Sequence, residues 1–147
     1  MTNVLLVEDS PFVMPALKEC IDETPNLLLA DCITNAANAK ILCLRRKIDL
    51  IIMDVCTADN ESGLKAAMEI KEFSPRTKVI IVTSMPEFSF IGKAKAAGCE
   101  GFWYKSEDIH SLKALIEKVI DGETVYPDDA PNVRIKDISS STLTDRQ

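Results

Sequence analysis

IDLIIMDV, residues 48–55, is a short apolar run that ends next to an acidic residue. Two further runs of this kind are VLLVEDS at 4–10 and KVIIVTS at 78–84, and a fourth, GFWYKS at 101–106, leads into a lysine. Short apolar runs with helical patterns between them are typical of a parallel sheet that is buried on both faces. The sequence therefore predicts an α/β sandwich with right-handed crossovers.

The expected strands and helices alternate along the chain. Strands are expected at about 3–8 and 27–32, in runs ending at Asp54 and Thr83, and at 101–104, with helices at about 10–23, 35–46, 63–73, 87–97 and 107–121. Ser10 and Pro11 supply an N-cap and a first-turn proline for the first helix. Pro15 would remove a backbone donor inside that helix, so we expect a kink or a late start.

Polar side chains gather where these strands end. Chemistry in sheets of this type collects at the carboxyl ends of the strands. The residues expected to share that rim are Glu8, Asp9, Asp54, Thr83 and Lys105. Crowded carboxylates repel, so the arrangement favours a divalent cation among them, with Thr83 and Lys105 positioned for an incoming anion. The rim therefore predicts a magnesium-assisted phosphoryl-transfer site.

Composition and charge exclude several classes of protein. A chain of 147 residues that is 46% apolar can bury one full core. A net charge of −6 gives no basic face for nucleic acid. The five cysteines form no C-x-x-C pair, which favours a reduced chain that uses them as small core residues. No apolar run is long enough to span a membrane, so we expect a cytoplasmic protein without membrane contact.

The set of rim residues, each at its strand end, resembles the receiver domain of two-component response regulators. The resemblance covers residues 3–121, and AGCEGFWYK at 97–105 is similar to the stretch that leads into the family's lysine. It places Phe102 at the family's aromatic switch position. The resemblance implies a doubly wound, flavodoxin-like fold, in which five parallel strands in the order 2-1-3-4-5 are flanked by five helices.

The same resemblance implies the chemistry of the rim. Asp54 would accept a phosphoryl group from a sensor histidine kinase or a small phosphodonor. The Mg²⁺ ligands would be Glu8, Asp9, Asp54 and the backbone carbonyl of Cys56. Lys105 would pair with Asp54 at rest and with the phosphate afterwards, and Thr83 and Phe102 would form the switch. Such a domain is a signalling phosphoacceptor with self-catalysed phosphotransfer and slow autodephosphorylation, and it is not an enzyme.

The sequence after residue 121 is polar and has no apolar periodicity, which is typical of a linker. VYP at 125–127 and LTDRQ at 143–147 are similar to the NarL/FixJ class, in which L-[ST]-x-R-[EQ] opens a DNA-binding helix-turn-helix domain. We therefore expect a receiver at 1–121 and a linker at 122–147, truncated before the domain that would contact DNA. Transcriptional output and a phosphorylation-dependent homodimer are the expected consequences.

The loop at 55–62 departs from the family pattern. Thr57-Ala58 replaces the usual Met-Pro, and one extra residue precedes Gly63, so we expect a different loop shape. Cys56 and Met85 offer no strong hydrogen bond to a hydrolytic water, which predicts a long-lived aspartyl phosphate.

The sequence leaves one alternative function open and argues against two others. A receiver-like interaction module that is not phosphorylated stays open as the alternative, because of the altered 55–62 loop. A phosphatase of the haloacid dehalogenase type would need a second aspartate where Cys56 stands. A flavodoxin-like cofactor binder would need a glycine-rich phosphate loop, whereas EDSPF at 8–12 is acidic and has no glycine. His110, the chain's one histidine, is expected on the surface of the last helix.

Overall fold

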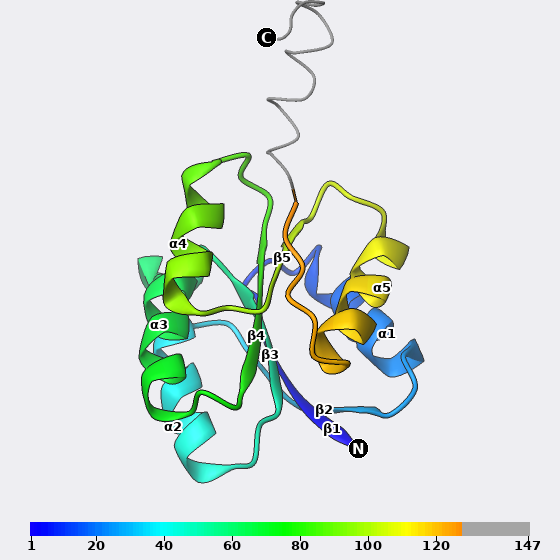
Figure 1. Ribbon diagram of the computed structural model, residues 1–147, viewed down its shortest axis with the longest axis horizontal. Coiled ribbons are helices and arrows are strands. Elements are labelled where there is room, and N and C mark those ends of the chain that lie inside the picture. The colour runs from blue at the N-terminus through cyan, green and yellow to red at the C-terminus, as the bar shows by residue number, and fades with distance from the viewer. Residues whose placement is uncertain (128–147) are drawn as a thin grey trace, which may run out of the picture.

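The computed structural model describes residues 1–127, which form five parallel strands in the order β2-β1-β3-β4-β5 (Figure 1). This confirms the expected order. The strands are β1 (Thr2–Val7), β2 (Leu27–Ile33), β3 (Leu50–Asp54), β4 (Lys78–Thr83) and β5 (Gly101–Tyr104). The helices are α1 (Met14–Glu23), α2 (Ala39–Arg45), α3 (Gly63–Phe73), α4 (Ser89–Ala97) and α5 (Ile109–Ile120), with short 3₁₀ turns η1 (Ala36–Asn38) and η2 (Ala58–Asn60). The LTDRQ stretch at 143–147 lies outside the described residues.

The helices cover both faces of the sheet. Helices α1 and α5 lie on one face, and α2, α3 and α4 lie on the other (Figure 1). Successive strand residues point to opposite faces, so each strand contributes to two cores. In β3, Leu50 and Ile52 pack toward α1 and α5, whereas Ile51 and Met53 pack toward α2, α3 and α4. A strand buried on both faces explains the continuous apolar run in the sequence.

The first helix starts late, as Pro15 predicted. Helix α1 begins at Met14, which leaves Pro15 in the first turn, where its missing N–H costs no helical hydrogen bond. The expected N-cap at Ser10 was wrong. Its hydroxyl instead accepts hydrogen bonds from the backbone N–H groups of Phe12 and Val13, both at 3.3 Å, in a turn that precedes the helix.

Gly63 allows α3 to start directly against the end of β3. A Cβ on this residue would lie 1.8 Å from the backbone oxygen of Asp54, so no other residue fits at this spacing. The N–H of Gly63 donates to the oxygen of Val55 at 2.8 Å, and the Ser62 hydroxyl caps the helix at the N–H of Lys65. The start of α3 therefore packs directly against the backbone of Asp54 and holds it in place.

The cysteines are free thiols, as expected, but they do not share one environment. Cys20 and Cys99 are buried, Cys32 and Cys43 are partly buried, and Cys56 is exposed. The expectation of a core position was wrong for Cys56, because it follows the end of β3 in the rim loop. His110 is exposed near the start of α5, as expected. Within residues 1–127, none of the helices combines the length and apolar character that a membrane crossing requires.

Candidate functional site

The expected rim residues meet at the carboxyl ends of β1, β3, β4 and β5. Oxygens from the carboxylates of Glu8, Asp9 and Asp54 all lie within 4.8 Å of one another. Glu8 and Asp54 are buried, and Asp9 is exposed. Thr83 is buried at the end of the next strand, β4. The parallel topology thus brings together residues that are almost a hundred positions apart in the sequence.

Lys105 joins two of these carboxylates. Its Nζ lies 2.8 Å from Oε1 of Glu8 and 3.2 Å from Oδ2 of Asp54. The expected ion pair with Asp54 is present, whereas the pair with Glu8 was missed. The available signal was the position of Glu8 directly after the apolar run at 4–7, which is buried, since a buried carboxylate needs a partner. Lys105 therefore compensates two buried charges at once.

Glu8 is held in place from the opposite side as well. Its side chain is 0% exposed, and its Oε2 accepts a hydrogen bond from the backbone N–H of Ser10 at 3.1 Å. The turn that begins at Ser10 and precedes α1 thus orients the carboxylate of Glu8. A carboxylate fixed in this way can serve as a preorganised cation ligand.

The pKa of Asp54 is raised above its ordinary value. Burial and then the neighbouring Glu8 carboxylate raise its pKa, Lys105 opposes both effects, and the resulting pKa is about 7. Three carboxylates here face the single ammonium group of Lys105. The cluster therefore has an excess of negative charge that a cation bound by oxygen ligands would neutralise.

The loop at 55–62 contains the short 3₁₀ turn η2, and the expectation that its shape differs from that of the family stays a prediction. Thr57 ties it to the segment after β2, because its Oγ1 accepts from the N–H of Ala36 at 2.9 Å and donates to the oxygen of Glu61 at 2.7 Å. Asp59 and Asn60 adopt positive φ angles of 61° and 57°, a conformation that aspartate and asparagine tolerate best among residues with a Cβ. Asp59 and Asn60 therefore form a tight turn within the loop.

Two sulfur side chains border the acidic cluster. The thiol of the exposed Cys56 lies 3.7 Å from the sulfur of Met85, which is 45% exposed. These residues follow Asp54 and Thr83 by two positions each. The solvent side of the rim is therefore lined there by weak hydrogen-bonding groups.

Thr83 and Phe102 are both neighbours of Tyr104, Thr83 through the pairing of β4 with β5 and Phe102 through its ring. The Oγ1 of Thr83 accepts a hydrogen bond from the N–H of Met85 at 3.0 Å, so it is engaged by its own loop. Thr83 pairs in register with Tyr104, whose ring meets that of Phe102 edge to face at 5.2 Å. Sequence reasoning missed Tyr104, although alternate residues of a strand share one face and could have placed it beside Phe102.

Comparison with known proteins agrees with this geometry. Residues 4–117 match the response regulator receiver domain family. The chain is 32% identical over 118 residues to the chemotaxis protein CheY of Halobacterium salinarum, in an alignment that covers 80% of this chain and 96% of that protein. It is 27% identical to the transcriptional regulatory protein DesR of Bacillus subtilis, in an alignment that covers 100% of this chain and 71% of DesR.

Solved structures show the same fold. A LuxR-family two-component response regulator from Aurantimonas sp. superimposes with a TM-score of 0.79 at 24% identity, covering 92% of this chain and 94% of that one. Because the family match extends over most of the chain and the topology agrees with it, the chain belongs to the response regulator receiver domain family of two-component systems.

Proposed function

We propose that Asp54 is the phosphoacceptor, and that the domain catalyses its own phosphorylation from a sensor histidine kinase or a small phosphodonor. The observation that supports this proposal most strongly is the position of Asp54. It ends the central strand, lies 3.2 Å from Lys105 and is grouped with two further carboxylates. Its ionised oxygen would attack the phosphorus, and the bond to the donor's leaving group would break. The product is an aspartyl phosphate.

The residues of the cluster fit a magnesium ion. Glu8, Asp9 and Asp54 supply hard oxygen ligands, which Mg²⁺ prefers. The backbone carbonyl of Cys56 is a fourth candidate, since the bridge between Cys56 and Ser62 uses the flanking groups of Val55 and Thr57 instead. When bound, Mg²⁺ would neutralise charge on the transferring phosphoryl group.

Lys105 and Thr83 would then respond to the new group. Phosphorylation places negative charge where Lys105 already lies, so its ammonium would pair with a phosphoryl oxygen. Thr83 would donate its hydroxyl hydrogen to another phosphoryl oxygen while its oxygen still accepts from the N–H of Met85, so a movement of Thr83 toward the phosphoryl group would pull on that contact. The loop after β4 would move with Thr83, and Phe102 would respond as the buried switch residue.

The output surface would lie around α4 and β5. Phe88 precedes α4 and is 54% exposed, Phe90 is partly buried, and Ile91 belongs to the core. We therefore place a phosphorylation-dependent homodimer contact at Phe88 and Phe90 rather than at Ile91. Any contact with DNA would come from a further domain, and the protein would act in the cytoplasm.

Intact-mass measurement tests the proposal. Incubation with acetyl phosphate and Mg²⁺ should add one phosphoryl group to the wild type and none to Asp54→Asn. The matched control is Asp59→Asn, which removes an aspartate of the neighbouring loop at a φ that asparagine tolerates, and it should label normally. Absence of an adduct on the wild type would favour the interaction module, and an adduct on Asp54→Asn would exclude Asp54 as the acceptor.

A further inference from the structure

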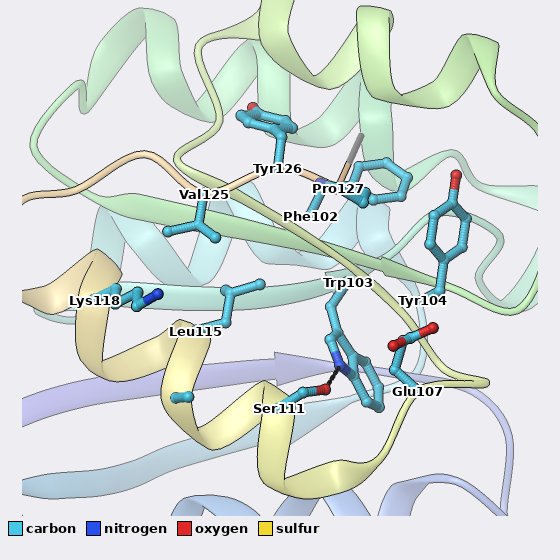
Figure 2. A pocket seen from close by; sticks show the side chains of 11 residues that line it. Phe102, Trp103, Tyr104, Glu107, Ser111, Leu115, Lys118, Val125, Tyr126 and Pro127 are labelled. Atoms are coloured by element: carbon cyan, nitrogen blue, oxygen red, sulfur yellow. Dashed lines mark hydrogen bonds between the residues drawn. The ribbon is translucent and has the colours of Figure 1, made fainter. Parts of the chain in front are cut away.

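Residues 125–127, here called the strap, follow α5 and run along the outer edge of β5 (Figures 1 and 2). The N–H of Val125 donates to the oxygen of Glu100 at 2.9 Å, and the N–H of Phe102 donates to the oxygen of Val125 at 3.1 Å. Val125 thus forms a parallel bridge with Gly101. The strap therefore provides hydrogen-bond partners for main-chain groups at the edge of β5 that would otherwise face solvent.

Tyr126 anchors the strap on the α4 side of the sheet. Its ring lies 6.4 Å from that of Phe102, and its hydroxyl donates to the backbone oxygen of Cys99. The ammonium of Lys95, in the last turn of α4, lies 5.1 Å from the ring centroid. One side chain of the strap thus contacts the end of α4, the start of β5 and the switch residue.

On the α5 side, Val125 packs against the core, but the space beside it is only partly filled. A cavity of about 440 Å³ lies between the strap, β5 and α5, and Trp103, Leu115 and Val125 are among the residues that line it (Figure 2). The strap is therefore held by two main-chain hydrogen bonds and by Tyr126, with a hollow on its other side. Val125 and Tyr126 each pack against one of the two cores, so release of the strap would cost these contacts, but it would leave the five strands of the sheet paired with one another.

The strap lies at the end of the row that begins at the rim. Thr83 pairs with Tyr104, Tyr104 packs on Phe102, and Phe102 packs on Tyr126. Phe102 is 1% exposed and its ring lies against those of Tyr104 and Tyr126, so a change of its rotamer alters its packing with both rings. Any movement of Phe102 is therefore coupled to the position of Tyr126.

We propose that the strap is a latch that stabilises the unphosphorylated arrangement and is released from β5 when Asp54 is phosphorylated. This inference rests on the proposed function of Asp54. Release would free the edge of β5 and change the direction in which the chain leaves the domain after Pro127. Coupling between two sites is reciprocal, so a weakened strap must favour the phosphorylated arrangement by the same factor.

Hydrogen exchange and calorimetry on the 147-residue chain test the latch. Beryllofluoride with Mg²⁺ serves as the phosphoryl mimic. Exchange of the Val125 and Phe102 amide hydrogens should become at least about fivefold faster when the mimic binds. By calorimetric titration, Tyr126→Ala should bind the mimic at least about fivefold more tightly than the wild type.

Two further variants sharpen the test. Val125→Pro keeps the tyrosine but deletes the N–H that bonds Glu100, and it should also tighten binding. The matched control is Phe73→Ala, which removes an aromatic ring 5.8 Å from the ammonium of Lys40 on α2, away from β5, and it should bind like the wild type.

The outcomes separate the latch from the proposed function. Unchanged amide exchange together with unchanged affinity in Tyr126→Ala and Val125→Pro would overturn the latch, and so would weaker binding in both variants. If the wild type still forms a phosphoryl adduct in that case, the role of Asp54 stands alone. If neither the adduct nor binding of the mimic is detected, the proposed function and the latch fail together.

Discussion

Replacing Lys105 by methionine would leave Glu8 and Asp54 without their common ion-pair partner. The lysine side chain is 10% exposed, and those of Glu8 and Asp54 are 0% and 7% exposed. The energetics of buried ion pairs therefore apply, and not the value of about 0–1 kcal/mol for exposed pairs. Loss of one partner of a buried pair costs about 3–5 kcal/mol, a large part of the about 5–15 kcal/mol by which a domain is stable. We expect Lys105→Met to lower the free energy of unfolding by that amount at pH 8 without divalent cations.

The stability lost in Lys105→Met should become smaller as the pH falls. Lys105 lowers the pKa of Asp54, so its removal lets Asp54 keep a proton to higher pH. A protonated Asp54 no longer needs the ammonium group. The difference between variant and wild type should therefore be smaller at pH 6 than at pH 8. Added Mg²⁺ should also reduce it, because the cation replaces the missing positive charge.

Urea unfolding followed by circular dichroism measures this difference in EDTA at both pH values. Lys65→Met is the matched control, since Lys65 is exposed on α3, and it should change the free energy of unfolding by no more than about 0.5 kcal/mol. If Lys105→Met stays within about 1 kcal/mol of the wild type at pH 8, the ion pairs contribute as little as exposed ones and the reasoning is refuted.

Three further predictions concern the same rim. Gly63→Ala should lower the free energy of urea unfolding by about 1–3 kcal/mol or more, because its Cβ would lie 1.8 Å from the backbone oxygen of Asp54. Gly92→Ala, which has open space around it in α4, should raise the free energy of unfolding by about 0.5–1 kcal/mol. Equal effects of the two substitutions would contradict this. Asp54→Asn should be more stable than the wild type at pH 8 in EDTA. The folded state raises the pKa of Asp54 from 3.8 to about 7, so the gain should shrink as the pH falls from 7 toward 4, and a gain that grows over that range would reverse the sign. Cys56→Asn or Met85→Glu should speed loss of the phosphorylated mass several-fold after donor removal, by holding a water beside the phosphorus; decay of the wild type at the same rate would refute this.

Local sequence signals predicted much of the fold. The bounds of α3, the end of β3 at Asp54 and the end of α4 before Gly98 all agree with the structure. These features depend on residues close in sequence: apolar periodicity marks the elements, and Gly98 adopts the φ of 87° that ends a helix. The rim residues followed from the same signals, because parallel strands bring their carboxyl ends to one edge.

Contacts between distant residues were harder to predict. The position of Glu8 after an apolar run indicates that its carboxylate needs a partner, but no spacing in the sequence shows that this partner is Lys105. The strap was expected to be part of a linker that begins at residue 122, and that boundary stays a prediction. A stretch with one valine and one tyrosine has no periodicity, so its pairing with β5 depends on an edge formed by other residues.

Locating the phosphoryl group tests the central claim most directly. After treatment with acetyl phosphate and Mg²⁺, borohydride reduces an acyl phosphate to a stable alcohol, and trypsin then releases the peptide at 48–65, which contains Asp49, Asp54 and Asp59. Fragmentation of this peptide identifies the aspartate that reacted. We expect the reduced residue at position 54 alone, and only in samples that contained Mg²⁺. Reduction at Asp49 or Asp59, or at position 54 without dependence on Mg²⁺, would contradict the account.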